Sequence, residues 1–211
     1  MKSSYLKNNY GDVFFTLIEA FRPMKCVELG VLNGYSSIAI GNGLKHNHKH
    51  KRNGEQPGHL DAYDLWNDYP FQHSDMNVVQ RTLETEEVSN YVTLFKGDAF
   101  ECWKAYENRS IQFLHIDISN TGEILRKIIK LWDHKMQCGG IIVFEGGSKE
   151  RDEFDWMTKY DKEKIRPELF SNKIINSNYV YGIYHKFPSL TVLLKKWENV
   201  WVDPMGIPHT D

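Results

Sequence analysis

The sequence has few of the features that mark secreted, membrane-bound or nucleic-acid-binding proteins. It contains only three cysteines, Cys26, Cys102 and Cys138, widely spaced and without a CxxC pair, which favours reduced thiols. No stretch approaches the ~20 apolar residues that a membrane span needs, and the first apolar run, Val13 to Ile18, does not suit a signal peptide. A formal charge of −2 argues against general binding of nucleic acid or of an anionic membrane. We therefore expect a cytoplasmic protein.

The sequence also lacks the glycine-rich motifs of common nucleotide-binding folds. It has no GxGxxG for a dinucleotide pyrophosphate and no GxxxxGK[ST]. Internal repeats and low-complexity linkers are absent too, and 211 residues with 41% hydrophobic side chains suit one globular domain. We predict a single domain over 1–211, with a helical lead-in at 1–24, a core at 25–196 and a tail at 197–211. Apolar tail residues, Val200, Trp201 and Val202, suggest a subunit contact and hence a homodimer.

Short apolar runs alternate with helix-length segments along the first 150 residues. This order implies βαβ units, and therefore a parallel sheet with helices on both faces. After Gly147 a charged segment, 149–166, precedes two further runs, 179–184 and 190–194, which are close enough to pair antiparallel. The sequence thus predicts an α/β fold with a Rossmann-like, doubly wound, seven-stranded, mostly parallel sheet and an antiparallel C-terminal hairpin. The other expected strands are 26–29, 60–66, 91–95, 111–116 and 140–144, and the expected helices are 35–44, 76–88, 99–106 and 124–131.

A histidine-rich segment, Lys45 to His59, interrupts this pattern. It includes His46, His48 and His50. Clustered histidines can bind a metal ion, but nothing in the spacing sets a ligand geometry. A solvated, mobile loop is the favoured interpretation.

Acidic residues lie at the predicted strand ends. In an open α/β sheet, ligands bind outside the carboxyl ends of the strands. Glu28 lies within the first strand, and Asp64, Asp98, Asp117 and Glu145 lie at or just after the ends of the other four. Such a row of carboxylates disfavours a phosphate-rich ligand and favours one with hydroxyl groups and positive charge.

The turn after the first strand suits a ligand that the backbone approaches closely. Gly30 and Gly34 leave room for that approach, and the helix that starts near Tyr35 and Ser36 offers free N–H groups to a single carboxylate. Asp64 follows about 30 residues later, where a carboxylate can accept both hydroxyls of a ribose.

These motifs resemble a known family, the class I S-adenosylmethionine-dependent methyltransferases. ELGVLNGYSS (28–37) looks like the ExGxxxGYS first motif of the catechol O-methyltransferase-like branch. The other matching segments are DAYD ending at Asp64, KGDA (96–99), FLHIDIS (113–119), GGIIVFEGG (139–147) and KFPSLTVLLKK (186–196). The resemblance spans residues 20 to 195 and implies the strand order 3-2-1-4-5-7-6.

The resemblance implies methylation of a small-molecule acceptor, such as a sugar or hydroxylated metabolite, on oxygen. Two alternatives stay open: a non-catalytic cofactor-binding module, and a nucleotide-dependent oxidoreductase or epimerase. Family roles place Glu28 and Ser36 by the methionine part of S-adenosylmethionine, Asp64 at its ribose and Asp98 at its adenine. The residues predicted to bind the cofactor are Glu28, Gly30, Gly34, Tyr35, Ser36, Asp64, Trp66, Asp98 and Asp117.

Relatives in this branch hold Mg²⁺ with acids after the fourth and fifth strands, which raises the possibility of a divalent cation here. Asp117 matches the first ligand and Glu145 can stand in for the second, but Gly146 occupies the place of an asparagine ligand and Asn120 that of a lysine. Without a metal, Asp117 or His115 is the candidate catalytic base. Acceptor contacts are expected from the N-terminal helix, the loop after Asp117 and the segment 146–160, which carries Trp156.

Structural roles compete with these functional ones. Glu28 can be a buried structural acid, Asp64 a turn cap and Asp98 a helix N-cap. His115 is more often a core histidine than a catalyst, and Tyr35 and Trp66 are more often packing residues than partners of a cation.

Overall fold

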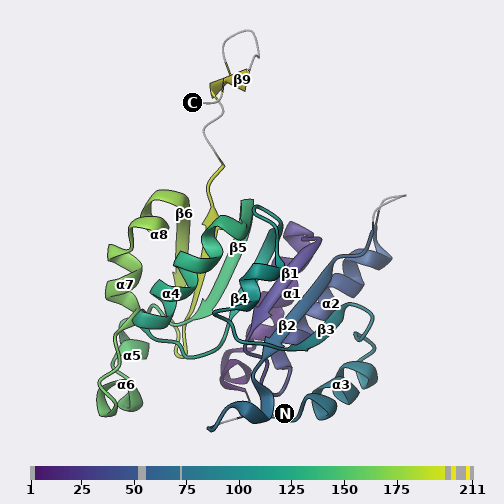
Figure 1. Cartoon of the computed structure of the whole chain (residues 1–211), viewed down its shortest axis with the longest axis horizontal. Coiled ribbons are helices and arrows are strands. Elements are labelled where there is room, and N and C mark those ends of the chain that lie inside the picture. The colour runs from purple at the N-terminus through teal and green to yellow at the C-terminus, as the bar shows by residue number, and fades with distance from the viewer. Residues whose placement is uncertain (1–2, 52–55, 72, 198–200, 203–207, 210–211) are drawn as a thin grey trace.

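A mixed sheet of seven strands forms the centre of the protein (Figure 1). The computed structural model describes residues 3–51, 56–71, 73–197, 201–202 and 208–209. The strands lie in the order β3-β2-β1-β4-β5-β7-β6; β1 to β5 are parallel, and β7 is antiparallel to β5 and β6. The fold class and strand order expected from the sequence are confirmed. The bounds are β1 (Lys25–Leu29), β2 (His59–Asp64), β3 (Val92–Lys96), β4 (Ile111–Ile116), β5 (Met136–Glu145), β6 (Tyr179–Tyr184) and β7 (Leu190–Lys195).

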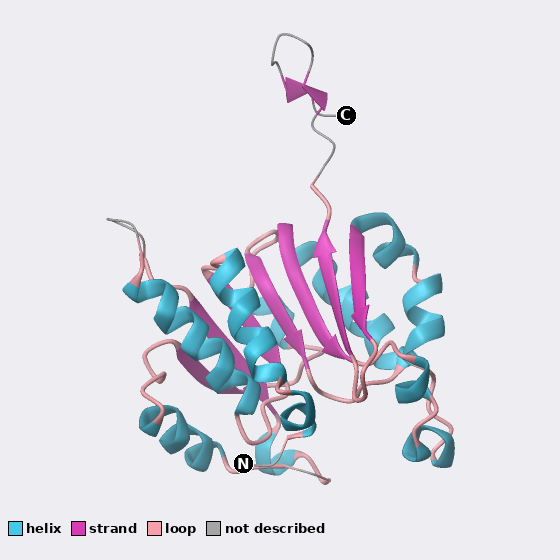
Figure 2. Cartoon of the chain, turned by 180° about the vertical axis from the view of Figure 1, so that it is seen from behind, coloured by secondary structure: helices cyan, strands magenta, loops and turns pink. Residues whose placement is uncertain are grey.

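Helices cover both faces of the sheet, as Figures 1 and 2 show from opposite sides. One apolar core lies between the sheet and α1 (Tyr10–Phe21), α2 (Tyr35–Lys49) and α3 (Met76–Thr85). The other lies between the sheet and α4 (Gly122–Trp132), α7 (Ile165–Ser171) and α8 (Lys173–Asn178). The central parallel strands β1, β4 and β5 are therefore largely buried on both sides, and their carboxyl ends remain available to a ligand. The edge strand β3 keeps exposed residues.

The amphipathic spacing over 124–131 predicts a helix that the structure contains as α4. Thr121 caps its start, because the Thr121 side chain accepts a hydrogen bond from the Ile124 backbone N–H. Leu125, Ile128 and Ile129 are buried against the sheet. The side-chain period of 3.6 residues was thus a sufficient signal for this element.

Two segments differ from the sequence expectation, and a third, the charged segment 149–166, had no predicted secondary structure. The strand expected over 60–66 ends at Asp64, and Trp66 begins a short 3₁₀ helix, η2 (Trp66–Asp68). The helix expected over 99–106 is only the 3₁₀ turn η3 (Cys102–Ala105). The charged segment after β5 folds into α5 (Lys149–Asp152) and α6 (Asp155–Lys159) and leads into α7.

The histidine-rich segment is not a loop over its first part. Helix α2 continues to Lys49, so His46 and His48 lie on a helix, and His48 Nδ1 is 2.8 Å from the Tyr91 hydroxyl. Residues 52–55 lie outside the described part of the chain. Within the described residues, no group of three or more His, Cys, Asp or Glu side chains is arranged to hold a metal ion.

The N-terminal segment contains a 3₁₀ turn, η1 (Ser4–Asn8), followed by α1. Near the other end, β8 (Trp201–Val202) pairs with β9 (Pro208–His209). Val200 and the side chains of Trp201 and Val202 fall outside what the structure describes, so the expected subunit contact stays a prediction.

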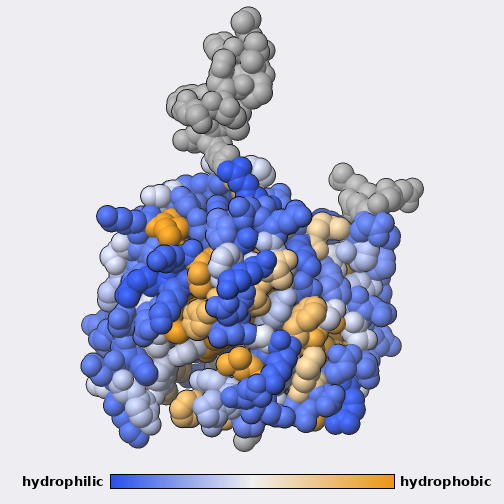
Figure 3. All heavy atoms as spheres, viewed as in Figure 1, coloured by the Kyte–Doolittle hydropathy of each residue, from blue (hydrophilic) through white to orange (hydrophobic). Residues whose placement is uncertain are grey.

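The face shown in Figure 3 is largely hydrophilic, with hydrophobic residues in small groups among polar ones. Isolated apolar residues of this kind are normal on a protein surface. None of the helices in the described part of the chain combines the length and apolar composition that a membrane crossing needs.

Candidate active site

A cavity of about 860 Å³ opens at the carboxyl ends of the parallel strands. These strand ends form the lower edge of the sheet in Figure 1. Each of β1 to β5 contributes a residue to its lining at or just after its last position. These residues are Gly30, Asp64, Gly97 with Asp98, Asp117 and Glu145. The four acids predicted at or just after strand ends therefore share one cavity, because parallel strands end at the same edge of the sheet.

Asp64 holds the turn after β1 against the end of β2. Its Oδ2 accepts hydrogen bonds from the backbone N–H groups of Val31 and Leu32, at 2.8 and 2.9 Å, and its Oδ1 accepts one from Trp66 at 2.8 Å. A carboxylate has about four lone-pair positions, so roughly one stays free for a ligand. The turn-capping role weighed from the sequence is thus present in the structure, and it limits the two-hydroxyl role predicted for Asp64.

Asp98 lies on the exposed side of the cavity. Its Oδ1 accepts a hydrogen bond of 2.8 Å from the Phe100 backbone N–H, as an N-cap does. Its Oδ2 has no hydrogen-bond partner among the residues that the structure describes, and the aromatic residues Tyr63 and Phe100 also line the cavity.

Glu28 does not line the cavity. It is fully buried between the sheet and helices α1 and α2. Both Ser36 and Ser37 donate hydrogen bonds to its carboxylate, and His115 Nδ1 lies 2.9 Å from Glu28 Oε1. The other ring nitrogen of His115 is 3.2 Å from the Tyr5 hydroxyl. These groups form a buried network behind the cavity wall.

His115 is completely buried and absent from the cavity lining. A catalytic base must come within hydrogen-bond reach of the proton that it removes. The structure places His115 between Glu28 and Tyr5 instead, a position that does not suit a direct catalytic base.

Three other residues predicted to bind a cofactor also lie away from the cavity. Gly34, in the left-handed region at φ 77°, precedes α2. The Tyr35 hydroxyl accepts a hydrogen bond of 3.1 Å from the Gly11 backbone N–H. Trp66 is 4% exposed and its indole donates to the Phe95 carbonyl oxygen at 3.0 Å. None of the three lines the cavity, and the packing alternative fits Tyr35 and Trp66.

Asp117 lines the cavity close to the polar side chains of Asn120 and Glu145. Burial raises the pKa of Asp117 to about 7, and the nearby Glu145 carboxylate adds to the rise against the opposing effects of His115, Asn120 and Tyr5. Asn120 Nδ2 donates a hydrogen bond of 3.1 Å to Asp117 Oδ1. A carboxyl group with a pKa near neutrality is suited to proton transfer.

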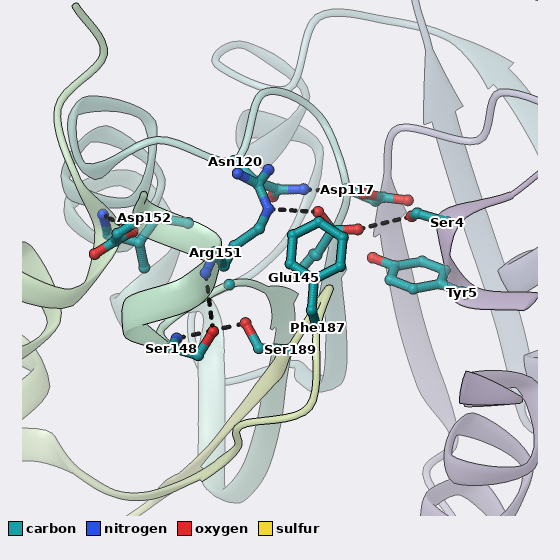
Figure 4. Close-up of polar contacts among 12 residues, drawn as sticks. Ser4, Tyr5, Asp117, Asn120, Glu145, Ser148, Arg151, Asp152, Phe187 and Ser189 are labelled. Carbon is teal, nitrogen blue, oxygen red and sulfur yellow. Dashed lines mark hydrogen bonds and ion pairs between the residues drawn. The ribbon is translucent and has the colours of Figure 1, made fainter. Parts of the chain in front are cut away.

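Glu145 is paired with a cationic side chain that the sequence interpretation did not single out. Arg151 Nε donates to Glu145 Oε1 at 2.9 Å, and Ser4 Oγ donates to Glu145 Oε2 at 2.7 Å (Figure 4). Each oxygen of this carboxylate therefore already accepts a hydrogen bond, and the ion pair with Arg151 offsets its negative charge. Arg151 lies in the segment 146–160, where acceptor contacts were expected, but no motif in the sequence marks the residue.

The residues present do not fit a divalent cation at Asp117 and Glu145. A guanidinium and a hydroxyl hold both Glu145 oxygens. A side chain at Gly146 could not replace the missing ligand, because Gly146 has φ 118° and an added Cβ would overlap Ile165 Cδ1. Mg²⁺ requires near-octahedral oxygen coordination, and one free carboxylate with an amide falls short of that. The tentative metal assignment is not supported by this geometry.

The chain matches the model of one protein family, described as a methyltransferase domain, over residues 27–145. No curated protein matches the sequence. This matched range runs from β1 to the end of β5 and so includes all five strand ends that line the cavity.

Solved structures share the fold at low sequence identity. A methyltransferase from Geobacter sulfurreducens is 11% identical, with 92% of this chain and 84% of that chain covered and a TM-score of 0.63. The O-methyltransferase TomG from Streptomyces achromogenes, solved with SAM, is 14% identical, with coverages of 90% and 80% and a TM-score of 0.61. An O-methyltransferase from Bacillus cereus, solved with SAH, is 13% identical, with coverages of 89% and 81% and a TM-score of 0.59.

The family match and the strand order agree with the resemblance recognised in the sequence motifs. The family model covers more than half of the chain, and the sheet order 3-2-1-4-5-7-6 is the one that the resemblance implied. The oxidoreductase and epimerase alternatives are thereby set aside. The chain belongs to the methyltransferase domain family and has the fold of the class I S-adenosylmethionine-dependent methyltransferases.

Proposed function

We propose that the protein transfers a methyl group from S-adenosylmethionine to an oxygen atom of a small-molecule acceptor. The observation that carries this proposal is the single cavity volume shared by the ends of β1 to β5, with acids from four of these strands in its lining. Its size of about 860 Å³ is within the range of sites for small molecules and cofactors.

The cavity residues fit the cofactor at one end. Asp98, with one oxygen free, suits the adenine amino group, while Tyr63 and Phe100 offer aromatic surfaces for the base. Asp64 suits one hydroxyl of the ribose. Gly30 leaves the backbone open beside it. The cofactor, when bound, supplies a methyl group activated by the positive charge on its sulfur.

The acceptor is expected at the opposite end of the cavity, where acidic, amide and guanidinium side chains lie together. Asp117, Asn120, Glu145 and Arg151 all line this part, together with the Trp156 ring. We assign Asp117 as the group that accepts the proton of the acceptor hydroxyl, which leaves the acceptor oxygen able to bond to the methyl carbon. S-adenosylmethionine would supply that carbon, and the electron pair of its broken carbon–sulfur bond would stay on sulfur. Alignment of the reacting atoms and exclusion of water supply most of the catalysis.

The buried Tyr5, His115 and Glu28 support this site from behind. Burial raises the pKa of the Tyr5 hydroxyl well above its usual value, and the Asp117 and Glu145 carboxylates add to the rise. Tyr5 therefore stays a neutral hydrogen-bonding group. Through Tyr5, the buried network connects the N-terminal turn η1 to the end of β4, and we assign His115 a positioning role.

Calorimetry with S-adenosylhomocysteine and with NAD tests the cofactor assignment. We expect S-adenosylhomocysteine to bind with one-to-one stoichiometry and NAD not to bind. Methyl transfer from labelled S-adenosylmethionine to a library of hydroxylated metabolites then tests the reaction. Binding of NAD alone would contradict the proposal, and cofactor binding without transfer to any acceptor would favour the non-catalytic module.

Replacement of Asp64 by alanine should weaken S-adenosylhomocysteine binding about 10- to 100-fold. The change removes one charged acceptor from the ligand and three hydrogen bonds from the turn after β1. Calorimetry checks the affinity, and Asp68→Ala is the matched control, because Asp68 is exposed and pairs with Lys96 at 2.6 Å outside the cavity lining. An unchanged affinity in Asp64→Ala would remove Asp64 from the binding site.

A further inference from the structure

The Arg151 guanidinium pairs with Glu145, one of the two residues that the sequence resemblance offered as metal ligands. We propose that Arg151 is the resident cation of this active site and binds the acceptor oxygen that becomes methylated, in its anionic form. This inference rests on the proposed function, since it assigns the acceptor end of the same cavity. It also predicts that methyl transfer is independent of divalent metal ions.

Arg151 is held rigidly from three sides. Its backbone N–H donates to Ser148 Oγ at 3.1 Å, its Nε donates to Glu145 at 2.9 Å, and its Cζ lies 5.2 Å from the centroid of the Trp156 ring. The residue is only 4% exposed. A guanidinium fixed in this way is preorganised, and little conformational freedom is lost when it binds a ligand.

One end of the guanidinium is left without a partner. Arg151 Nη1 is buried and makes no hydrogen bond within the described part of the chain. Leaving a buried donor of a charged group unsatisfied is unfavourable, and the residue lines the cavity. Figure 4 shows the guanidinium turned toward the side of the site that carries Asn120 and Asp117. The unsatisfied donor therefore marks a position for a ligand atom in the cavity.

The ligand atom that suits this position is an oxygen with negative charge. Arginine has no acceptor atom and forms its strongest hydrogen bonds with oxyanions. Glu145 pairs with the guanidinium through Nε, which leaves the Nη1 donor without a partner among the described residues. Contact with Nη1 would lower the pKa of an acceptor hydroxyl, whose proton passes to Asp117. An acceptor that is already a carboxylate needs no such proton transfer.

The acceptor group is thus an oxyanion. Two classes of molecule can present one: compounds with an acidic hydroxyl and carboxylates. The adjacent Trp156 ring and the apolar lining residues Ile118 and Ile124 suit a planar, partly apolar molecule. We therefore choose 4-nitrophenol and benzoate as probes. The phenolate of 4-nitrophenol absorbs visible light, so its ionisation can be followed directly.

The first experiment titrates the saturated complex of the protein with S-adenosylhomocysteine. We expect at least one of the two probes to bind, and bound 4-nitrophenol to ionise at lower pH than free 4-nitrophenol. Arg151→Gln should weaken binding about 10- to 100-fold and abolish the shift in ionisation. Arg151→Lys should retain part of both effects, because it keeps the charge. Failure of both probes to bind, or equal binding by wild type and Arg151→Gln, would overturn the assignment.

Loss of the buried ion pair can itself disturb folding, since Glu145 would be left unpaired. The double variant Arg151→Gln/Glu145→Gln removes both charges together and serves as the second test of probe binding. Arg126→Gln is the matched control, because Arg126 forms ion pairs with Glu163 and Glu168 away from the cavity. We expect the control to bind the probes as the wild type does.

The second experiment measures Mn²⁺ binding to the same complex by electron paramagnetic resonance. We expect no stoichiometric Mn²⁺ site in the wild type. A stoichiometric site that Asp117→Asn abolishes would overturn the inference. The two proposals fail separately: loss of S-adenosylhomocysteine binding contradicts the proposed function, whereas normal binding with an arginine-independent probe site or a metal site contradicts only the role of Arg151.

Discussion

Replacement of Asp117 by asparagine is expected to reduce the rate of methyl transfer about 100- to 10,000-fold, with S-adenosylhomocysteine affinity changed less than about threefold. Asparagine retains the size of the side chain and can still contact Asn120, but it cannot accept a proton. Asp117 lines the acceptor end of the cavity and has a pKa raised by burial to near neutrality. The loss should therefore fall on turnover more than on cofactor binding.

The raised pKa of Asp117 also predicts the direction in which activity changes with pH. A base must be deprotonated to act, and a raised pKa keeps Asp117 protonated to higher pH than an ordinary aspartate. Wild-type activity should fall as the pH is lowered through the neutral range. The residual activity of Asp117→Asn should not show this fall. Single-turnover rates across pH measure it. Asp155→Asn, an exposed carboxylate on α6, is the control, and a variant that loses cofactor affinity but keeps turnover would contradict the placement of Asp117.

Replacement of Gly30 by alanine is expected to destabilise the fold by about 2–5 kcal/mol. Gly30 has φ 92°, which side-chain-bearing residues rarely adopt. An added Cβ would also overlap the backbone carbonyl of Asp117, where β1 and β4 end side by side. The ends of β1 and β4 must move apart to make room for the alanine side chain, and this movement would distort the floor of the cavity. Urea unfolding measures the change in the free energy of unfolding.

Gly182 provides the matched control for this substitution. It lies in the edge strand β6, where an added Cβ would meet nothing within 4 Å. We expect Gly182→Ala to change the free energy of unfolding by less than about 1 kcal/mol. Equal effects at the two glycines would contradict the close approach of β1 and β4 at the floor of the cavity.

The local sequence pattern was most informative for helices and strands whose own hydrophobic spacing shows which face is buried. Strand β4 and helix α4 were predictable because their hydrophobic spacing alone specifies a buried strand and a one-sided helix. Helix α2 was not predictable to its full length. Its glycines are weak helix formers, but an added Cβ at Gly43 would lie 2.7 Å from Ile18 Cβ. Glycine therefore permits close packing of α1 on α2, and that packing stabilises residues which the local sequence does not favour as helix.

In the candidate site, too, some residues could be placed from the sequence pattern and others only from the tertiary structure. Asp64, Asp98, Asp117 and Glu145 lie at strand ends, so parallel pairing brings them to one edge without further information. Glu28 lies one position before the end of β1, paired with Ala62 and His115 in the sheet. Side chains alternate between the faces of a strand, and this one points into the layer beneath α1 and α2. Glu28 is buried with Ser36 and His115 because its side chain points to this face of the sheet. The residue type alone does not show to which face a side chain points.

The amino-acid sequence alone determined the order of the elements, the family and the row of acids at the sheet edge, because these follow from hydrophobic periodicity and from motifs at strand ends. The tertiary structure decided which charges meet. Arg151 reaches Glu145 only because the backbone turns at Gly146 and Gly147, both in conformations with positive φ, and because α5 then packs against Trp156. Contacts between side chains on successive short elements depend on three-dimensional packing, and no spacing in the sequence encodes them.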